Sequence, residues 1–300
     1  MLYMKDSEKY WISDYQEVLL GRQKELNEYL LSLKLENKAV STIIKYKRVL
    51  ERFLRECPIS LEELTSDVVR EWLIGFSQGK SERTIDLYLS VISSFFNFCL
   101  DEEYMEKTVV KKRWRPKVPY SLPKYLDEYE YAHVKVISEQ LSLRNRALVL
   151  FLFSTGCRVS EVSNLNIQDV DFGKRTANVI GKGGKFRHVY ISEECALVLN
   201  SYLLTRSYTP TEPLFKNKFG THLLEGGIRK VLKKLGKHAE LEQSLHPHRC
   251  RHTFATNMLA RGADLQLIGD LLGHSDLNTT RIYAQIPTEE MILKYQSIMG

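Results

Sequence analysis

Apolar residues recur at helical spacing through the first hundred residues, without the alternation that marks a strand. Between residues 16 and 33, a run of leucines lies along one side of a predicted helix: Leu19, Leu26, Leu30 and Leu33. Further helices are predicted over 41–55, 65–76 and 81–101, with Ser41 as a candidate N-cap. Four helices of these lengths predict a small all-α bundle.

A different pattern begins near residue 125, where helical and strand-like segments are mixed. Two strands are predicted over 175–180 and 186–191, joined by a glycine-rich turn at 181–185. The other segments have helical periodicity, over 127–140, 143–154, 158–164, 193–205, 222–238, 249–261, 264–272 and 277–284. We therefore expect a mainly helical domain with a small antiparallel hairpin, followed by an amphipathic segment at 289–298.

A stretch that cannot be helical separates these two parts. Pro116, Pro119 and Pro123 lie too close together for the interior of a helix. Residues 107–118 also carry six basic side chains and no acidic one. We therefore divide the chain into a helical domain over 1–106, a basic linker over 107–124, a second domain over 125–284 and a tail over 285–300.

Composition excludes several classes of protein. Of the 300 residues, 43% are apolar and 27% are charged, which excludes a disordered chain. The longest apolar run, at 147–153, is too short to cross a bilayer, and acidic residues interrupt the start where a signal peptide would lie. The five cysteines are odd in number and contain no C-x-x-C pair, so we expect buried, reduced thiols in a cytoplasmic protein without a membrane segment.

The net charge of +6 is modest, but it is unevenly distributed. Residues 1–106 carry 14 basic and 19 acidic side chains, so the first domain is acidic overall, whereas the linker is strongly basic. Basic clusters of this kind are typical of segments that bind phosphate, although a solvated, extended linker would have the same composition.

The second predicted helix carries one basic face within the acidic domain. Its apolar side holds Ile43, Tyr46, Leu50 and Phe53, and the opposite side is basic. A basic helix face is often only solvated surface. Our candidates for nucleic-acid contacts are this face, the start of the fourth helix and the linker: Lys45, Arg48, Arg52, Arg55, Lys80, Arg83, Lys111, Lys112, Arg113 and Arg115.

Common nucleotide and metal motifs do not occur in the sequence. There is no Walker-type loop, no GxGxxG after a strand and no H-E-x-x-H. His246, His248 and His252 cluster, but their spacing does not place three imidazoles on one helical face, and we expect Pro247 to break the helix there. We therefore expect neither a metal nor a cofactor.

Polar motifs lie at the ends of predicted segments in the second domain. They are T-G-C-R-V-S-E at 155–161, G-K-G-G-K at 181–185, H-x-x-R-H-x-F-A-T at 248–256, and L-L-G-H at 271–274 with a tyrosine nine residues later. Each alone has an ordinary explanation, such as a surface ion pair between Arg158 and Glu161. Together, in this order, they resemble the tyrosine recombinases, the integrase family of site-specific DNA strand-exchange enzymes. The helical first domain is similar to the SAM-like core-binding domain of that family.

The resemblance implies a role for each motif. Tyr283 would attack the phosphorus and form a 3′-phosphotyrosyl bond. Arg158, Arg251 and His274 would stabilise the negative charge of the pentacoordinate phosphorane. Lys182 would protonate the leaving 5′ oxygen.

Two further residues complete the implied site. His248 would accept or relay the proton of the nucleophile, and Glu161 would orient the arginine and histidine side chains. Because the reaction conserves bond energy, it needs neither ATP nor a metal.

The resemblance also implies partners. Double-stranded DNA would lie between the two domains, and the protomers would act as a homotetramer, with the tail 285–300 docking on a neighbouring protomer; packing of the tail on its own domain is the alternative. No separate arm-binding domain is expected before residue 16, which favours an Xer-like resolvase or a simple transposon integrase. Two rival functions remain open: a regulator that only binds DNA, and a type IB topoisomerase-like relaxing enzyme.

Overall fold

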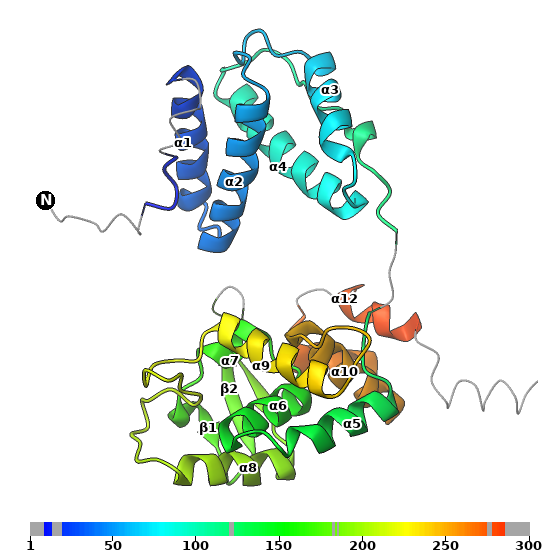
Figure 1. Ribbon diagram of the computed structural model, residues 1–300. Helices are drawn as coiled ribbons and strands as arrows, with labels where there is room; N and C mark the ends of the chain where they lie inside the picture. The colour runs from blue at the N-terminus through cyan, green and yellow to red at the C-terminus, as the bar shows by residue number, and fades with distance from the viewer. Residues whose placement is uncertain are drawn as a thin grey trace, which may run out of the picture. The chain divides into compact units, whose positions relative to one another are not determined.

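The computed structural model describes residues 9–13, 20–119, 123–181, 184, 186–274 and 278–285. The chain forms two compact units, Met1–Tyr120 and Ser121–Gly300 (Figure 1). The expected fold class is confirmed, because the first unit is all-α and the second is mainly helical with a small antiparallel sheet. Within the described ranges, no helix is long and apolar enough to cross a membrane.

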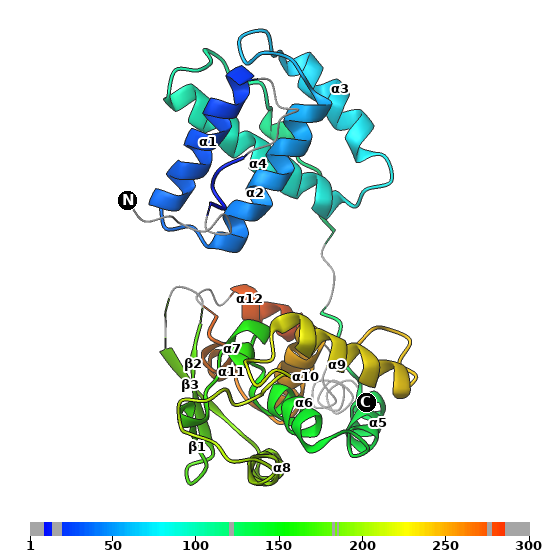
Figure 2. The same ribbon diagram turned by 60° about the vertical axis from the view of Figure 1, so that its left-hand side comes forward.

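Four α-helices enclose one apolar core in the first unit. They are α1 (Leu20–Leu35), α2 (Val40–Glu56), α3 (Ser66–Ser77) and α4 (Glu82–Asp101) (Figure 2). The start predicted for the first helix falls on residues 14–19, which lie outside the described residues. Ile43, Leu50 and Phe53 are buried in this core, as the apolar side of α2 predicts, and Tyr46 packs partly buried against it.

The N-terminal caps of these helices differ in kind. The Ser81 hydroxyl accepts a hydrogen bond from the Thr84 backbone N–H at 3.3 Å and caps α4. The prediction of Ser41 as a cap was wrong, because α2 begins at Val40 and Ala39 occupies the capping position without a side-chain hydrogen bond. Burial of its apolar face therefore stabilises α2 without help from a cap.

The start of the basic segment packs against this first unit. Val109 is buried in the core, and Trp114, in the short 3₁₀-helix η2 (Lys112–Trp114), packs partly buried against it. Arg115 forms an ion pair with Asp86 of α4 at 3.7 Å. These contacts hold the four cations of 111–115 on the surface of the helical unit.

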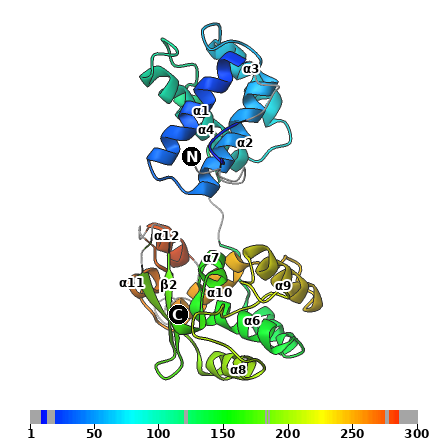
Figure 3. The same ribbon diagram turned by 90° about the vertical axis from the view of Figure 1, so that its left-hand side faces the viewer.

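The second unit is built mainly from helices. They are α5 (Glu128–Ser138), α6 (Leu143–Thr155), α7 (Val159–Ser163), η3 (Ile167–Asp169), α8 (Glu193–Leu204), α9 (Glu225–His238), α10 (Pro247–Ala260), α11 (Leu265–Leu272), α12 (Asn278–Arg281) and η5 (Ile282–Gln285). Helix α6 is buried along its length from Ala147 to Phe153, and α8 and α10 pack against it on opposite sides (Figure 3). All five cysteines of the chain are buried and unpaired, as expected.

A three-stranded antiparallel sheet lies beside these helices, in the order β1 (Val170–Asp171), β2 (Thr176–Ile180), β3 (Phe186–Tyr190). Figure 2 shows the sheet at one edge of the unit, next to α11. The sequence predicts only β2 and β3, because β1 has two residues and is too short for an alternating pattern. In the hairpin, Val179 pairs with Arg187 and Ile180 with Phe186.

Two predicted helix starts were displaced for identifiable reasons. Helix α9 begins at Glu225 rather than at 222, because His222 forms a β-bridge with Lys216 and Leu223 donates its N–H to the Phe215 carbonyl. Pro247 was expected to break a helix and instead occupies the first turn of α10. A proline fits there because the first helical N–H groups have no intrahelical acceptor.

Gly156 makes the turn between α6 and α7 possible. Its backbone is left-handed, with φ of 59°, and a Cβ there would lie 2.5 Å from Phe254 Cδ1 and 2.9 Å from Leu272 Cδ2. Gly262, in the same unit, is also left-handed, with φ of 83°, but nothing lies within 4 Å of its would-be Cβ.

We therefore expect Gly156→Ala to destabilise the second unit by about 3 kcal/mol, because it combines overpacking with backbone strain. Gly262→Ala is the matched control and should cost about 1 kcal/mol, from backbone strain alone. Urea unfolding of both variants measures the difference. Equal losses of unfolding free energy in the two variants would show that the Phe254 and Leu272 side chains move aside without an energetic penalty.

Candidate active site

The turn from α6 into α7 presents Arg158 and Glu161 together. Glu161 lies in the first turn of α7, and its Oε2 accepts the backbone N–H of Arg158 at 2.7 Å, which caps the helix. Its Oε1 accepts from Arg158 Nη1 at 2.9 Å. The Glu161 side chain is 1% exposed and that of Arg158 is 32% exposed, so the carboxylate is buried while part of the guanidinium faces solvent.

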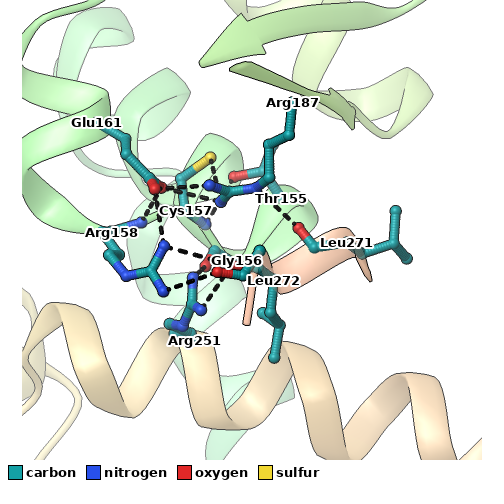
Figure 4. Close-up of polar contacts among 10 residues, drawn as sticks. Thr155, Gly156, Cys157, Arg158, Glu161, Arg187, Arg251, Leu271 and Leu272 are labelled. Atoms are coloured by element: carbon teal, nitrogen blue, oxygen red, sulfur yellow. Dashed lines mark hydrogen bonds and ion pairs between the residues drawn. The ribbon is translucent and has the colours of Figure 1, made fainter. Parts of the chain in front are cut away.

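A second arginine, which lies outside the motifs of the sequence, binds the same carboxylate. Arg187 of β3 donates from Nη1 to Glu161 Oε1 at 2.6 Å and from Nη2 to Oε2 at 2.9 Å. Burial would raise the pKa of Glu161, but the hydrogen bonds and charge of Arg187, together with the contacts of Arg158, hold it below its ordinary value. Figure 4 shows both guanidinium groups around this carboxylate.

Arg251 reaches the same place from α10. It is 6% exposed and donates to the Gly156 carbonyl at 2.8 Å and to the Leu272 carbonyl at 2.7 Å (Figure 4). These carbonyls stand at the C-terminal ends of α6 and α11, where backbone oxygens lack intrahelical partners. Burial, with the charge of Arg158, lowers the pKa of Arg251 to about 10, so it remains charged at neutral pH.

His274 is placed by the end of α11. Gly273, with φ of 65°, ends the helix in a left-handed turn, and the His274 N–H bonds back to the Gly269 carbonyl at 3.0 Å. The His274 Nδ1 lies 2.7 Å from the hydroxyl of buried Thr280. Burial, followed by the charges of three arginines, lowers the pKa of His274 to about 4, so the ring is neutral at pH 7.

Tyr283 lies in η5, in a small apolar cluster with Ala255, Ile268 and Leu272. Its side chain is 1% exposed, and its hydroxyl lies 2.8 Å from His252 Nδ1. Burial raises the pKa of Tyr283 to about 12, although the charge of Arg251 opposes this. The phenol is therefore protonated and sequestered in this conformation.

His248, Arg251 and His252 all lie on α10, at spacings that place them along one side of the helix. His248 lies at the surface, and partial desolvation of its ring, followed by the charges of Arg251, Arg229 and Arg158, lowers its pKa. His252 belongs to the motif at 248–256, but no role in the site is assigned to it from the sequence. Only its contact with Tyr283 distinguishes it.

The structure thus brings together five of the predicted site residues, with the predicted Tyr283 nearby, and adds Arg187 and His252. Arg158, Glu161, His248, Arg251 and His274 surround the ends of α6 and α11, with Arg187 beside them and Tyr283 held nearby on His252. Within the described part of the chain, the Glu161 carboxylate accepts hydrogen bonds from arginines and from no histidine. Lys182 and all but the first residue of the predicted tail 285–300 lie outside the described residues.

The charge of this cluster favours an anion. Three guanidinium groups, from Arg158, Arg187 and Arg251, face a single carboxylate, that of Glu161. Guanidinium groups that are charged and hydrogen-bonded in fixed positions are suited to binding phosphate oxygens. Across the described part of the chain, no group of three or more His, Cys, Asp or Glu could hold a metal ion.

The candidate DNA contacts all lie in the first unit. Lys45, Arg48 and Arg55 are exposed on α2, and Lys80 and Arg83 are exposed where α4 begins. The linker candidates are exposed as well: Lys111, Lys112, Arg113 and Arg115.

Arg52 of the α2 face has partners within its own unit. Its Nε donates to Glu56 at 2.8 Å, and its guanidinium lies 5.0 Å from the centre of the Phe76 ring. These contacts compete with a phosphate for the Arg52 guanidinium.

Two family models match the chain. Residues 124–290 match the phage integrase family, and residues 26–103 match the SAM-like N-terminal domain of phage integrases. The chain is 36% identical over 277 residues to tyrosine recombinase XerC of Bacillus subtilis, covering 87% of this chain and 91% of that protein. It is 34% identical over 276 residues to tyrosine recombinase XerA of Pyrococcus furiosus, covering 90% and 92%.

Solved structures share the fold. The XerH site-specific recombinase, bound to a palindromic difH substrate in a post-cleavage complex, aligns with a TM-score of 0.75 at 23% identity, covering 96% of this chain and 90% of that chain. A lambda integrase dimer bound to a COC′ core site aligns with a TM-score of 0.72 at 17% identity, covering 87% and 94%.

The lowered pKa of His274 predicts how the stability of the protein depends on pH. Its ordinary pKa of 6.5 applies in the unfolded chain, whereas its folded pKa is about 4. Below pH 6.5 the unfolded state therefore binds a proton that the folded state does not, and stability falls as the pH is lowered toward 4. We expect His274→Gln to lose less free energy of unfolding between pH 7 and pH 5 than the wild type, as measured by urea unfolding. Parallel losses would contradict a depressed pKa at His274.

Proposed function

The chain belongs to the phage integrase family of tyrosine recombinases, and from this we infer that it is a site-specific recombinase that cuts and rejoins double-stranded DNA. One observation carries the inference to the chemistry. Arg158 and Arg251 converge beside His274, with one buried carboxylate among them and a tyrosine held nearby. This arrangement suits a phosphodiester that is to be attacked by a phenol.

The transfer step is a transesterification at phosphorus. The Tyr283 oxygen bonds to phosphorus as the bond from phosphorus to the 5′ oxygen breaks, and the released 5′ oxygen takes a proton from Lys182. Arg158 and Arg251 donate to the non-bridging oxygens, where negative charge accumulates. The reverse reaction with the 5′-hydroxyl of another strand rejoins the DNA.

The histidines have separate tasks in this scheme. His274 is neutral, so it donates a hydrogen bond to the phosphate without adding charge. His248, whose pKa is also lowered, is able to accept the phenol proton at neutral pH. The phosphotyrosyl bond conserves the energy of the phosphodiester, so the cycle needs neither ATP nor a metal.

Tyr283 cannot react from its present position. Tyr283 is 1% exposed and its hydroxyl is held on His252, so the nucleophilic oxygen is shielded from any bound duplex. We propose that DNA binding moves α12 and η5 so that the hydroxyl leaves His252 for the scissile phosphate. Each of these elements has only four residues, so such a shift costs little free energy.

We also propose how the rest of the chain serves the reaction. The basic face of α2, the start of α4 and the basic segment 111–115 contact DNA phosphates. Four protomers assemble on two DNA sites, and the tail 285–300 docks on a neighbouring protomer. The full set of site residues disfavours a regulator that only binds DNA, and the Xer relatives disfavour a topoisomerase-like relaxing enzyme.

The assignment of the nucleophile is tested by Tyr283→Phe. We expect this variant to bind site DNA within about threefold of the wild type and to form no covalent adduct on a nicked suicide substrate, because a phenyl ring has no oxygen to attack phosphorus. Tyr129→Phe is the matched control on an exposed tyrosine of the same unit and should leave adduct formation unchanged. An adduct with Tyr283→Phe on a denaturing gel would disprove the assignment.

The basic segment is tested by salt dependence. Replacing Lys111, Lys112, Arg113 and Arg115 by glutamine should weaken DNA binding and reduce the slope of log K against log salt by up to about 3.6, at about 0.9 for each phosphate that is no longer neutralised. Four exposed cations placed elsewhere serve as the control: Lys24, Lys38, Arg70 and Lys174, each changed to glutamine. If both quadruple variants keep the wild-type slope, the segment is only a spacer.

A further inference from the structure

Arg187 enters the site from the sheet, and the transfer scheme above does not use it. Besides its two bonds to Glu161, its Nε donates to the Leu271 carbonyl at 3.1 Å, and its Nη2 lies 3.9 Å from Cys157 Sγ. All three nitrogens of the guanidinium therefore have partners within the protein. Figure 4 shows the side chain between the Glu161 carboxylate and the end of α11.

Exposure and partners separate Arg187 from Arg158, and its carboxylate partner separates it from Arg251, which binds only backbone carbonyls. Its side chain is 12% exposed, whereas that of Arg158 is 32% exposed. Arg158 makes longer bonds to the Leu272 and Gly273 carbonyls, at 3.4 and 3.1 Å. A phosphate can displace those bonds, but it cannot displace the two short charge-assisted bonds between Arg187 and Glu161 without leaving a carboxylate buried and unpaired.

The contacts of Arg187 continue to the turn that carries His274. Consecutive carbonyls at the end of α11 accept from different arginines: Leu271 from Arg187, and Leu272 from Arg251. A Cβ on Gly273 would lie 3.0 Å from Arg187 Cδ, so the arginine packs directly over this turn. The next residue is His274.

We propose that Arg187 is a positioning residue for strand transfer, which fixes Glu161, and through it Arg158, and also fixes the turn before His274. The proposal rests on the roles given above to Arg158 and His274. Without Arg187, the Glu161 carboxylate would take its remaining hydrogen bonds from Arg158 and draw that guanidinium away from the phosphate. The Leu271 carbonyl would lose its side-chain donor in the same step.

The first measurement is the rate of covalent adduct formation on a nicked suicide duplex at saturating protein. We expect Arg187→Gln to lower this rate about 100-fold, because small displacements of catalytic groups have effects of that size. DNA affinity should stay within about threefold of the wild type, because Arg187 does not contact DNA. Arg187→Lys keeps the charge but not the paired donors of the guanidinium, and it should form the adduct about tenfold faster than Arg187→Gln.

The control is Arg175→Gln. Arg175 lies beside β2 and forms an exposed ion pair with Glu193 at 3.4 Å. The Arg175→Gln variant should form the adduct at the wild-type rate. Thermal unfolding shows whether each variant is folded. If Arg187→Gln does not fold, Arg187→Lys carries the comparison, and a wild-type adduct rate in the variant that folds would overturn the proposal.

A second substrate separates positioning from general loosening of the structure. A methylphosphonate at the scissile position carries no negative charge on its non-bridging atoms, so a guanidinium that neutralises this charge contributes less. We expect the loss caused by Arg187→Gln to shrink to below about tenfold on this substrate, as it should for Arg158→Gln. An equal loss on both substrates would mean that Arg187 has only a structural role, and the proposal would fall.

The same experiment distinguishes this proposal from the function on which it rests. If the wild type forms no adduct, the recombinase chemistry itself is contradicted. The other outcome is that the wild type reacts and the methylphosphonate reduces the rate loss of Arg158→Gln but not that of Arg187→Gln. In that case only the positioning role of Arg187 is contradicted.

Discussion

The site depends on one buried carboxylate. Glu161 is 1% exposed, and a charge at that depth is tolerated only because two guanidinium groups and a backbone N–H surround it. Through these bonds it joins α7 to β3 and fixes the start of a helix. Removing a partner from such a pair costs about 3 to 5 kcal/mol, so the position of Arg158 follows from the stability of the fold. The site is therefore built before any DNA arrives.

Helix ends give the arginines a second set of partners. Helices α6 and α11 both end in left-handed glycines, Gly156 and Gly273, and expose carbonyls that have no acceptor role within their own helices. Arg251 binds one carbonyl from each helix and so ties the two ends together. Stability and chemistry thus use the same side chains, and substitutions of Arg251 will combine both effects.

Much of this could be predicted from the sequence, and the rest could not for physical reasons. Helix positions and the motifs around Arg158 and Arg251 follow from periodicity and spacing. Arg187 left a weaker signal: it shares the inward face of its strand with Val189, which is unusual for a charge, but only the folded structure shows that its partner is Glu161. The burial of Tyr283 on His252 depends on contacts between α10 and η5, which no local pattern encodes.

In the free protein, backbone carbonyls bind the arginines to which we assign the phosphate. Arg158 and Arg251 bind the partial negative charges of Gly156, Leu272 and Gly273, which hold the guanidinium groups together despite their mutual repulsion. In the proposed reaction, a phosphate would bring full negative charge to the same donors and would displace the longer of these bonds at little cost. The arginines then need small shifts rather than new folding, and the electrostatic stabilisation of the transition state is largely preorganised. Tyr283 is the exception under this proposal, because its buried hydroxyl lies on His252 in the free protein and would have to leave it to reach the phosphate.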